Sequence, residues 1–375
     1  MSPKGAAATQ PAAATQPAYA GPERRTGLPA TESFVERRHG TPPYGLDRSR
    51  SSGLDGLRAL AALAVVGYHL RTVSGLSFGP LDPVVSGADT GVYVFFALSG
   101  YLLYKPFVRG HVDLVGYGLK RAGRIVPGYL VALVGLVILT GTQLPLQHPL
   151  PFLTISSSYN LDLRGFLGNA WTLSAEILFY LTLPLIAAAA RGREAIVLGG
   201  LAIVSVCAAT YHRIALTPEN AWITGTFPLV FYAFVPGMLL ALLEAQYPAQ
   251  LRRLRSWPYL AIGIGYIVLG ALMTILPVAL ATGFGTVLVM GWLLNHRLPG
   301  SRALGFFGGA SYAIYLWHKD ALIAFGPWLG LALTLVAASL SWVLVERPIL
   351  AVIHNVDARR RRRTRAVQPV AVSVL

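Results

Sequence analysis

The sequence predicts an all-α membrane protein, a polytopic bundle of transmembrane helices. Hydrophobic residues make up 54% of the 375 residues and charged residues 13%, against roughly 25% charged residues in an average soluble domain. Apolar runs of about twenty residues recur from Leu54 into the 340s, and each is long enough to cross a bilayer core. A soluble α/β protein would alternate such runs with polar helical faces, which this sequence lacks.

Three segments are expected along the chain. Residues 1–52 predict a disordered, basic cytoplasmic tail, because they are rich in Ala, Pro, Gln, Thr and Arg and repeat ATQPA at 8–12 and 14–18. This tail is too long and polar to begin a cleaved signal peptide, so the first apolar run is expected to be a retained anchor. Residues 53–348 form the transmembrane domain, and 349–375 a basic cytoplasmic C-terminal tail.

Ten spans are expected in the transmembrane domain. They lie roughly at 55–74, 88–108, 125–143, 168–190, 194–211, 222–244, 257–275, 278–295, 303–325 and 327–346. A single kinked helix around Pro277 would instead give nine spans and put the two tails on opposite sides of the membrane.

The formal charge of +15 is distributed as in a membrane protein and not as in a nucleic-acid-binding protein. Lys and Arg concentrate in both tails and in alternate short loops. Basic loops stay on the cytoplasmic side of a membrane, and an even number of spans places both tails there. The charge therefore favours ten spans, two cytoplasmic termini and a location in the cell (plasma or inner) membrane.

Arg58 and His69 are two ionisable residues of the first predicted span. They are eleven residues apart, which places them on one helix face and separates them by roughly 16 Å. Arg58 is then at the cytoplasmic rim and His69 deep in the membrane. An ionisable residue in a span indicates a functional site, although a boundary arginine and a packing histidine also explain the pair.

Glu176 is the acidic residue in the middle of the fourth predicted span. Its helix enters from the outside, so Glu176 and His69 reach the same depth in a core of roughly 30 Å. A carboxylate beside an imidazole orients the ring and favours its charged form. The sequence therefore predicts a His69–Glu176 dyad that acts as a general base on a hydroxyl. The alternative is that Glu176 only hydrogen-bonds a neighbouring helix.

Lys120, Arg121 and Arg124 cluster in a cytoplasmic loop before the third predicted span. Arg121 and Arg124 would share a face if the helix has begun there. Two guanidinium groups so placed suit phosphate, which each can bind bidentately. Anchoring by the positive-inside rule explains the same residues without a ligand.

Two further segments predict packing or a pocket. In Gly91–Gly100, small residues allow close approach of another helix. In Ser311–His318, the aromatic residues suit an interfacial belt or a pocket wall, and Trp171, Tyr315 and His318 are candidates for that wall. The sequence contains no metal-ligand cluster, phosphate-binding glycine loop or nucleophile elbow.

These segments, in this order, resemble the membrane-bound acyltransferase-3 family, which O-acylates sugars and related hydroxyl compounds. The matching pieces are Leu54–Ala61 with His69, Gly91–Gly100, Arg121–Pro127, Trp171–Glu176, Ser311–His318 and Glu346–Pro348. The resemblance covers the whole predicted membrane part, so it identifies 53–348 as an acyltransferase domain.

The resemblance implies that cytoplasmic acyl-CoA is a co-substrate and that no cofactor is tightly bound. It also implies that Arg58, Arg121 and Arg124 hold the phosphates of CoA and that His69 is the essential histidine. The acceptor is expected to be a hydroxyl of a carbohydrate, polysaccharide, glycolipid or macrolide, and the acyl group is expected to be short.

Two other classes of function fit the sequence. In a proton-coupled transporter or flippase of a sugar or lipid, His69 and Glu176 would form a proton relay. A sugar or lipid sensor would bind without turnover. A direct transfer from acyl-CoA is favoured over an acyl-enzyme, because the sequence shows no cysteine or activated serine near the base.

Overall fold

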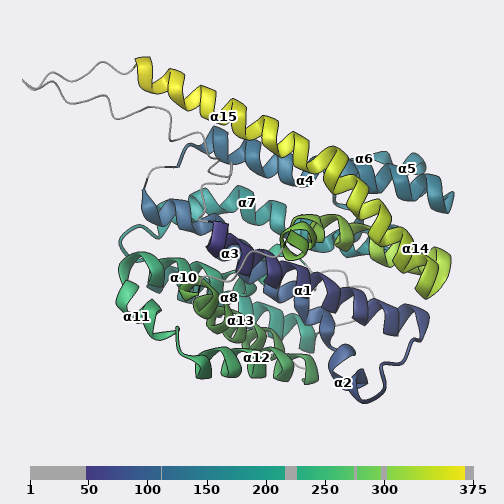
Figure 1. The fold of residues 1–375 in the computed structure, drawn as a ribbon, viewed down its shortest axis with the longest axis horizontal. Coiled ribbons are helices and arrows are strands. Elements are labelled where there is room, and N and C mark those ends of the chain that lie inside the picture. Colours follow the sequence, from purple (N-terminus) through teal and green to yellow (C-terminus); the bar gives the residue numbers. More distant parts are fainter. Residues whose placement is uncertain (1–47, 111, 216–225, 274–276, 297–301, 368–375) are drawn as a thin grey trace, which may run out of the picture. The chain divides into compact units, whose positions relative to one another are not determined.

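The computed structural model describes residues 48–110, 112–215, 226–273, 277–296 and 302–367, and in these ranges the regular secondary structure is all helical (Figure 1). The predicted all-α class is therefore confirmed. Most of the predicted N-terminal tail, up to residue 47, lies outside the described residues, and so does the chain after residue 367. The described helices belong to one compact unit, Pro42–Leu375.

Ten long helices make up most of this unit. They are α1 (Arg48–Ser74), α3 (Gly91–Arg109), α4 (Leu114–Thr140), α7 (Trp171–Ala189), α8 (Glu194–Ile214), α10 (Val235–Gln246), α12 (Trp257–Leu272), α13 (Pro277–Asn295), α14 (Arg302–Ser341) and α15 (Arg347–Val367). Short helices connect them: α2 (Asp82–Val85), α5 (Leu144–Gln147), α6 (Pro149–Leu153), α9 (Phe227–Val230) and α11 (Pro248–Arg253). Several 3₁₀ turns and one π-helical turn, Trp342–Glu346, complete the described elements.

The described helices fit a membrane protein. Five segments are long and apolar enough to cross a bilayer, or seven if each of two bent pairs counts as one span. Every predicted span overlaps a helix, but α12 and the apolar part of α13, Leu280–Asn295, are shorter than the other candidates. The number of ten spans and the side on which each terminus lies stay predictions.

The start of the third predicted span is wrong. The apolar pattern placed it at residue 125, whereas α4 begins at Leu114. The helix therefore contains Lys120, Arg121 and Arg124, which were expected in a loop. Charged residues end an apolar window but do not end a helix, since Lys and Arg are good helix formers.

The chain reverses direction in two helical hairpins. Gly263 of α12 and Gly285 of α13 lie backbone to backbone: a methyl group on Gly263 would stand 2.9 Å from the carbonyl oxygen of Gly285. The single kinked helix through Pro277 is therefore not formed. α14 reverses at Gly326, whose φ of 74° and ψ of −178° suit glycine alone, and is followed by Pro327. This turn separates the predicted spans 303–325 and 327–346.

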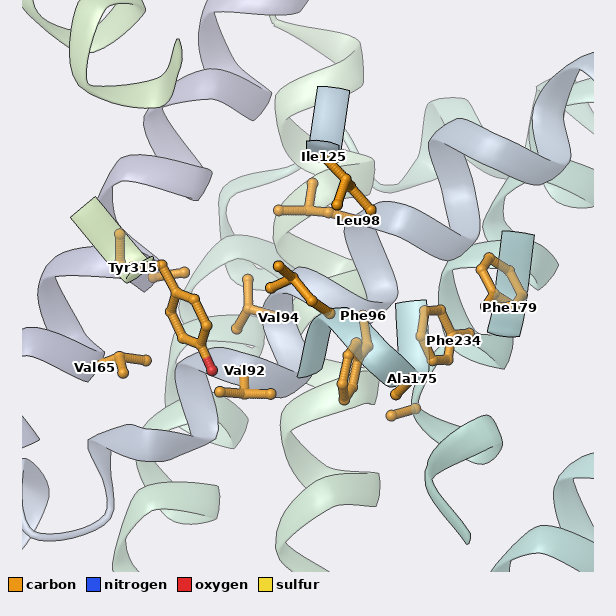
Figure 2. Packing of buried hydrophobic residues seen from close by; sticks show 14 of the residues in the cluster. Val65, Val92, Val94, Phe96, Leu98, Ile125, Ala175, Phe179, Phe234 and Tyr315 are labelled. Atoms are coloured by element: carbon orange, nitrogen blue, oxygen red, sulfur yellow. The ribbon is translucent and has the colours of Figure 1, made fainter. Parts of the chain in front are cut away.

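The core is packed around α3. Gly100 of α3 contacts the backbone of Phe234, and Gly237 of α10 contacts that of Ala97, so the two helices touch without intervening side chains. The close approach predicted for Gly91–Gly100 is confirmed. Figure 2 shows the buried aromatic stack beside it, in which the ring centroid of Phe234 lies 4.6 Å from that of Phe96 and 4.1 Å from that of Phe179.

The α3–α10 contact generates a test of stability. A methyl group on Gly237 would overlap the carbonyl oxygen of Ala97, whereas one on Gly199 of α8 would meet nothing within 4 Å. We expect Gly237→Ala to destabilise the protein by about 1–3 kcal/mol through overpacking. Gly199→Ala should be neutral or slightly stabilising. The midpoints of thermal unfolding in detergent measure both, and equal midpoints would contradict the described packing.

Candidate active site

A cavity of about 750 Å³ lies between α1, α3, α4, α7, α14 and α15. Much of its wall is apolar and is contributed by Val92, Phe95, Phe96, Leu103, Ile125 and Leu173, among others. Along α3 the wall extends from Val92 to Arg109, which corresponds to roughly 25 Å of helix. The cavity is thus long enough for an extended ligand rather than a compact one.

The cationic side chains of the cavity wall come from three helices. They are Arg58 of α1, Lys105 and Arg109 of α3, and Lys120, Arg121 and Arg124 of α4, and they face the carboxylates of Asp55 and Glu176. The structure therefore brings together the three arginines that the sequence suggested for phosphate binding. The sequence did not suggest Lys105 and Arg109 as cavity residues, because basic residues near the ends of spans were interpreted only as signals for the cytoplasmic side of the membrane.

Four of these six cations, including Arg124, form ion pairs with carboxylates of the protein. Lys105 lies 2.7 Å and Arg109 3.5 Å from carboxylate oxygens of Glu244, and Lys120 lies 2.6 Å from Asp357 of α15. Among the described residues, Arg58 and Arg121 form no ion pair within 4.0 Å. These two guanidinium groups are available to an anion in the cavity.

Arg124 is held by α14 and the π-helical turn. Its guanidinium lies 3.5 Å from the carbonyl oxygen of Gly309, 3.9 Å from Glu346 and over the rings of Tyr312 and Trp342. Glu346 is fully buried and accepts a hydrogen bond of 3.0 Å from Ser341. π-Helical turns often occur at functional sites, and this one carries both Trp342 and Glu346 to the same arginine.

The predicted His69–Glu176 dyad is wrong. Glu176 instead accepts a hydrogen bond of 2.6 Å from Ser99 of α3. α3 contacts both α1 and α7, and Ser99 of α3, rather than His69 of α1, is the hydrogen-bond partner of the Glu176 carboxylate. Depth in the membrane was predicted from helix rise, but rise does not give the direction that a side chain takes around its helix.

His69 contacts a second histidine. Its Nδ1 lies 3.1 Å from Nε2 of His318 and 3.0 Å from the carbonyl oxygen of Val65. His318 is completely buried, and its own Nδ1 lies 2.8 Å from the carbonyl oxygen of Tyr315. Sequence reasoning missed this pair, since the two histidines are 249 residues apart.

Neither His69 nor His318 lines the cavity, whereas Tyr315, which neighbours His318, does. The ring centroid of Tyr315 lies 5.6 Å from that of His318. Its hydroxyl donates to the carbonyl oxygen of Asn169 at 3.0 Å. Of the three residues proposed for a pocket wall, Tyr315 alone lines this cavity: His318 lies one helical turn further along α14, and Trp171 packs on Phe96 with ring centroids 6.0 Å apart.

Known proteins share this sequence pattern. Residues 51–346 match the family model of the acyltransferase domain. The chain is 31% identical to the exopolysaccharide production protein ExoZ of Rhizobium meliloti, over 69% of this chain and 89% of that protein. It is 28% identical to nodulation protein 10 of Rhizobium leguminosarum bv. viciae, over 72% and 84% of the two chains.

A third relative is the putative peptidoglycan O-acetyltransferase YrhL of Bacillus subtilis, which is 26% identical over 79% of this chain and 54% of its own length. No solved structure matches the chain. The family match extends over most of the chain and includes Arg58, His69, Arg121, Arg124 and the whole cavity up to Trp342. The chain therefore belongs to the membrane-bound acyltransferase-3 family.

Proposed function

We propose that this protein is an integral membrane O-acyltransferase that moves a short acyl group from cytoplasmic acyl-CoA to a hydroxyl of a carbohydrate. The observation that carries the proposal is the cavity of about 750 Å³, which is cationic at one end and apolar toward Tyr315. Tyr315 neighbours His318, and His318 contacts His69. An acyl-CoA has the same asymmetry, with phosphates at one end and a thioester on an uncharged arm.

The donor is held at its phosphates. Arg58 and Arg121 have no ion pair among the described residues and supply guanidinium groups that bind phosphate bidentately. Arg124, fixed between Glu346 and two aromatic rings, adds a third. Arg58 to His69 is roughly 16 Å along α1, so the arm of the donor runs from the arginines toward the histidine.

The basic end of the cavity faces the cytoplasm. α4 carries Lys120, Arg121 and Arg124 there, and α15 packs beside it through the Lys120–Asp357 ion pair. Basic ends of membrane helices stay on the cytoplasmic side. With ten spans in the cell membrane, both termini lie on that side and His69 lies toward the outer surface, where a secreted or surface acceptor would meet it.

The reaction is a direct transfer. Nε2 of His69 takes the proton of the acceptor hydroxyl, and the oxygen attacks the thioester carbonyl. The new C–O bond forms, the C–S bond breaks, and the thiolate of CoA receives the proton from His69. An acyl-cysteine is not required, and Cys207 lies exposed on α8.

The relatives support a carbohydrate acceptor. Their names refer to exopolysaccharide production and to O-acetylation of peptidoglycan. The relay on which a transporter or flippase would depend lacks its central contact, because Glu176 bonds to Ser99 and His69 to His318. Acyl transfer therefore explains more of the described contacts than proton-coupled transport does.

The base is tested with His69→Ala. Loss of a general base lowers the rate by about 10²- to 10⁴-fold, so we expect transfer of label from radiolabelled acetyl-CoA to the carbohydrate fraction of membranes to fall by that factor. His296→Ala is the control, since His296 directly follows α13, does not line the cavity and places its Nδ1 2.8 Å from the carbonyl oxygen of Trp292. Transfer at the wild-type rate in His69→Ala would refute the mechanism.

The donor site is tested with Arg121→Ala and Arg124→Ala. Each loses a charge-assisted hydrogen bond to phosphate, worth about 1.5–3 kcal/mol. We therefore expect the Kd for acetyl-CoA, measured by calorimetry on the purified protein, to rise by about tenfold or more for each. Arg253→Ala, in the exposed part of α11, is the matched control. Unchanged affinity for acetyl-CoA in both arginine variants would mean that the two residues only keep their helix end on the cytoplasmic side of the membrane.

A further inference from the structure

The hydrogen-bonding geometry around His69 and His318 assigns the proton on each ring. A carbonyl oxygen cannot donate, so Nδ1 of His318, at 2.8 Å from the oxygen of Tyr315 and 3.1 Å from that of Ile314, carries a proton. Nδ1 of His69 carries one for the same reason, because it lies 3.0 Å from the oxygen of Val65. When both rings are neutral, Nε2 of each is a lone pair.

The contact between the two rings then has one direction. His69 donates its single Nδ1 proton, which is shared between the carbonyl oxygen of Val65 at 3.0 Å and Nε2 of His318 at 3.1 Å, and His318 accepts. This bond leaves Nε2 of His69 as the basic atom. The ring planes are inclined at 66°, so the rings meet edge on rather than stacking.

His318 is itself firmly held. Its side chain is completely buried. The backbone carbonyl oxygen of Tyr315 accepts a hydrogen bond from Nδ1 of His318 and another from the side-chain amide of Asn169. The hydroxyl of Tyr315 donates a hydrogen bond to the carbonyl oxygen of Asn169 and accepts one of 3.1 Å from the hydroxyl of Thr172. The network joins the start of α7 to α14, and its last member toward α1 is Nε2 of His318.

We propose that His318 is a positioning residue for acyl transfer, which accepts the Nδ1 proton of His69 and aims Nε2 of His69 at the acceptor hydroxyl. This rests on the proposed function, in which His69 is the base. When Nε2 takes the proton, the ring of His69 becomes positive and its bond to His318 becomes charge-assisted, which strengthens it. His318 thus stabilises the protonated ring without exchanging a proton, because its own proton stays on Nδ1, hydrogen-bonded to the carbonyl oxygen of Tyr315.

The pair His318→Gln and His318→Asn tests this role. The amide of glutamine reaches the place of Nε2 and can accept from His69, whereas that of asparagine reaches only the place of Nδ1 and can bond the oxygen of Tyr315. Both are polar and differ by one methylene. We expect kcat for acetyl transfer to stay near the wild-type value in His318→Gln and to fall on the order of tenfold or more in His318→Asn. The KM for acetyl-CoA should not change in either, since His318 does not line the cavity.

A second arm separates positioning from folding. In a His69→Ala background, adding His318→Asn should not lower the residual rate further, because a residue that acts through His69 has nothing left to act on. Three results would overturn the inference. The first is a further loss of rate in the His69→Ala background, and the second is a kcat of His318→Asn equal to that of the wild type. The third is an equal loss of kcat in the glutamine and asparagine variants at unchanged thermal stability. These outcomes differ from failure of the proposed function, in which His69→Ala alone would be as active as wild type.

Discussion

The cost of a charged side chain in a hydrocarbon layer is the constraint on which the rest of this structure depends. Arg58, Arg121 and Glu176 sit on three different apolar helices, and each helix is turned so that its charge faces one shared cavity. A charge facing lipid would cost several kcal/mol. The helices can therefore adopt few rotations about their axes, and the charged groups gather on the inside without being neighbours in sequence.

Glycine contacts let the remaining helix faces close around this cavity. Gly100 and Gly237 bring α3 and α10 into backbone contact, and Gly308 does the same for α14 against Asp55 of α1. The cavity wall between α1, α3 and α4, by contrast, carries cationic side chains that repel one another, so these faces do not close into a dry contact. Tight packing on one side of α3 and charge repulsion on the other together leave an extended cavity.

Helix periodicity and charge predicted the elements of this arrangement but not their rotation. The all-α class, the hairpin turn between 325 and 327 and the shared face of Arg121 and Arg124 follow from local patterns. The partner of His69 does not, because the rotation of α7 is set by its contact with α3, where Ser99 meets Glu176. His318 could be found only from the fold, since a contact across 249 residues leaves no trace in spacing.

The contacts of His69 in the structure can orient the proposed base without a carboxylate. A carboxylate beside an imidazole adds a negative charge and stabilises the protonated ring, whereas Nε2 of His318 contacts Nδ1 of His69 without adding a charge. In the proposed mechanism a neutral His318 offers only a lone pair at Nε2, so it orients His69 while leaving Nε2 of His69 free until the reaction begins. Glu176, placed instead among the arginines, balances their charge where no base is needed. In the proposed function the two tasks therefore belong to different groups: Glu176 compensates the charge of the donor site, and His318 orients the base, His69.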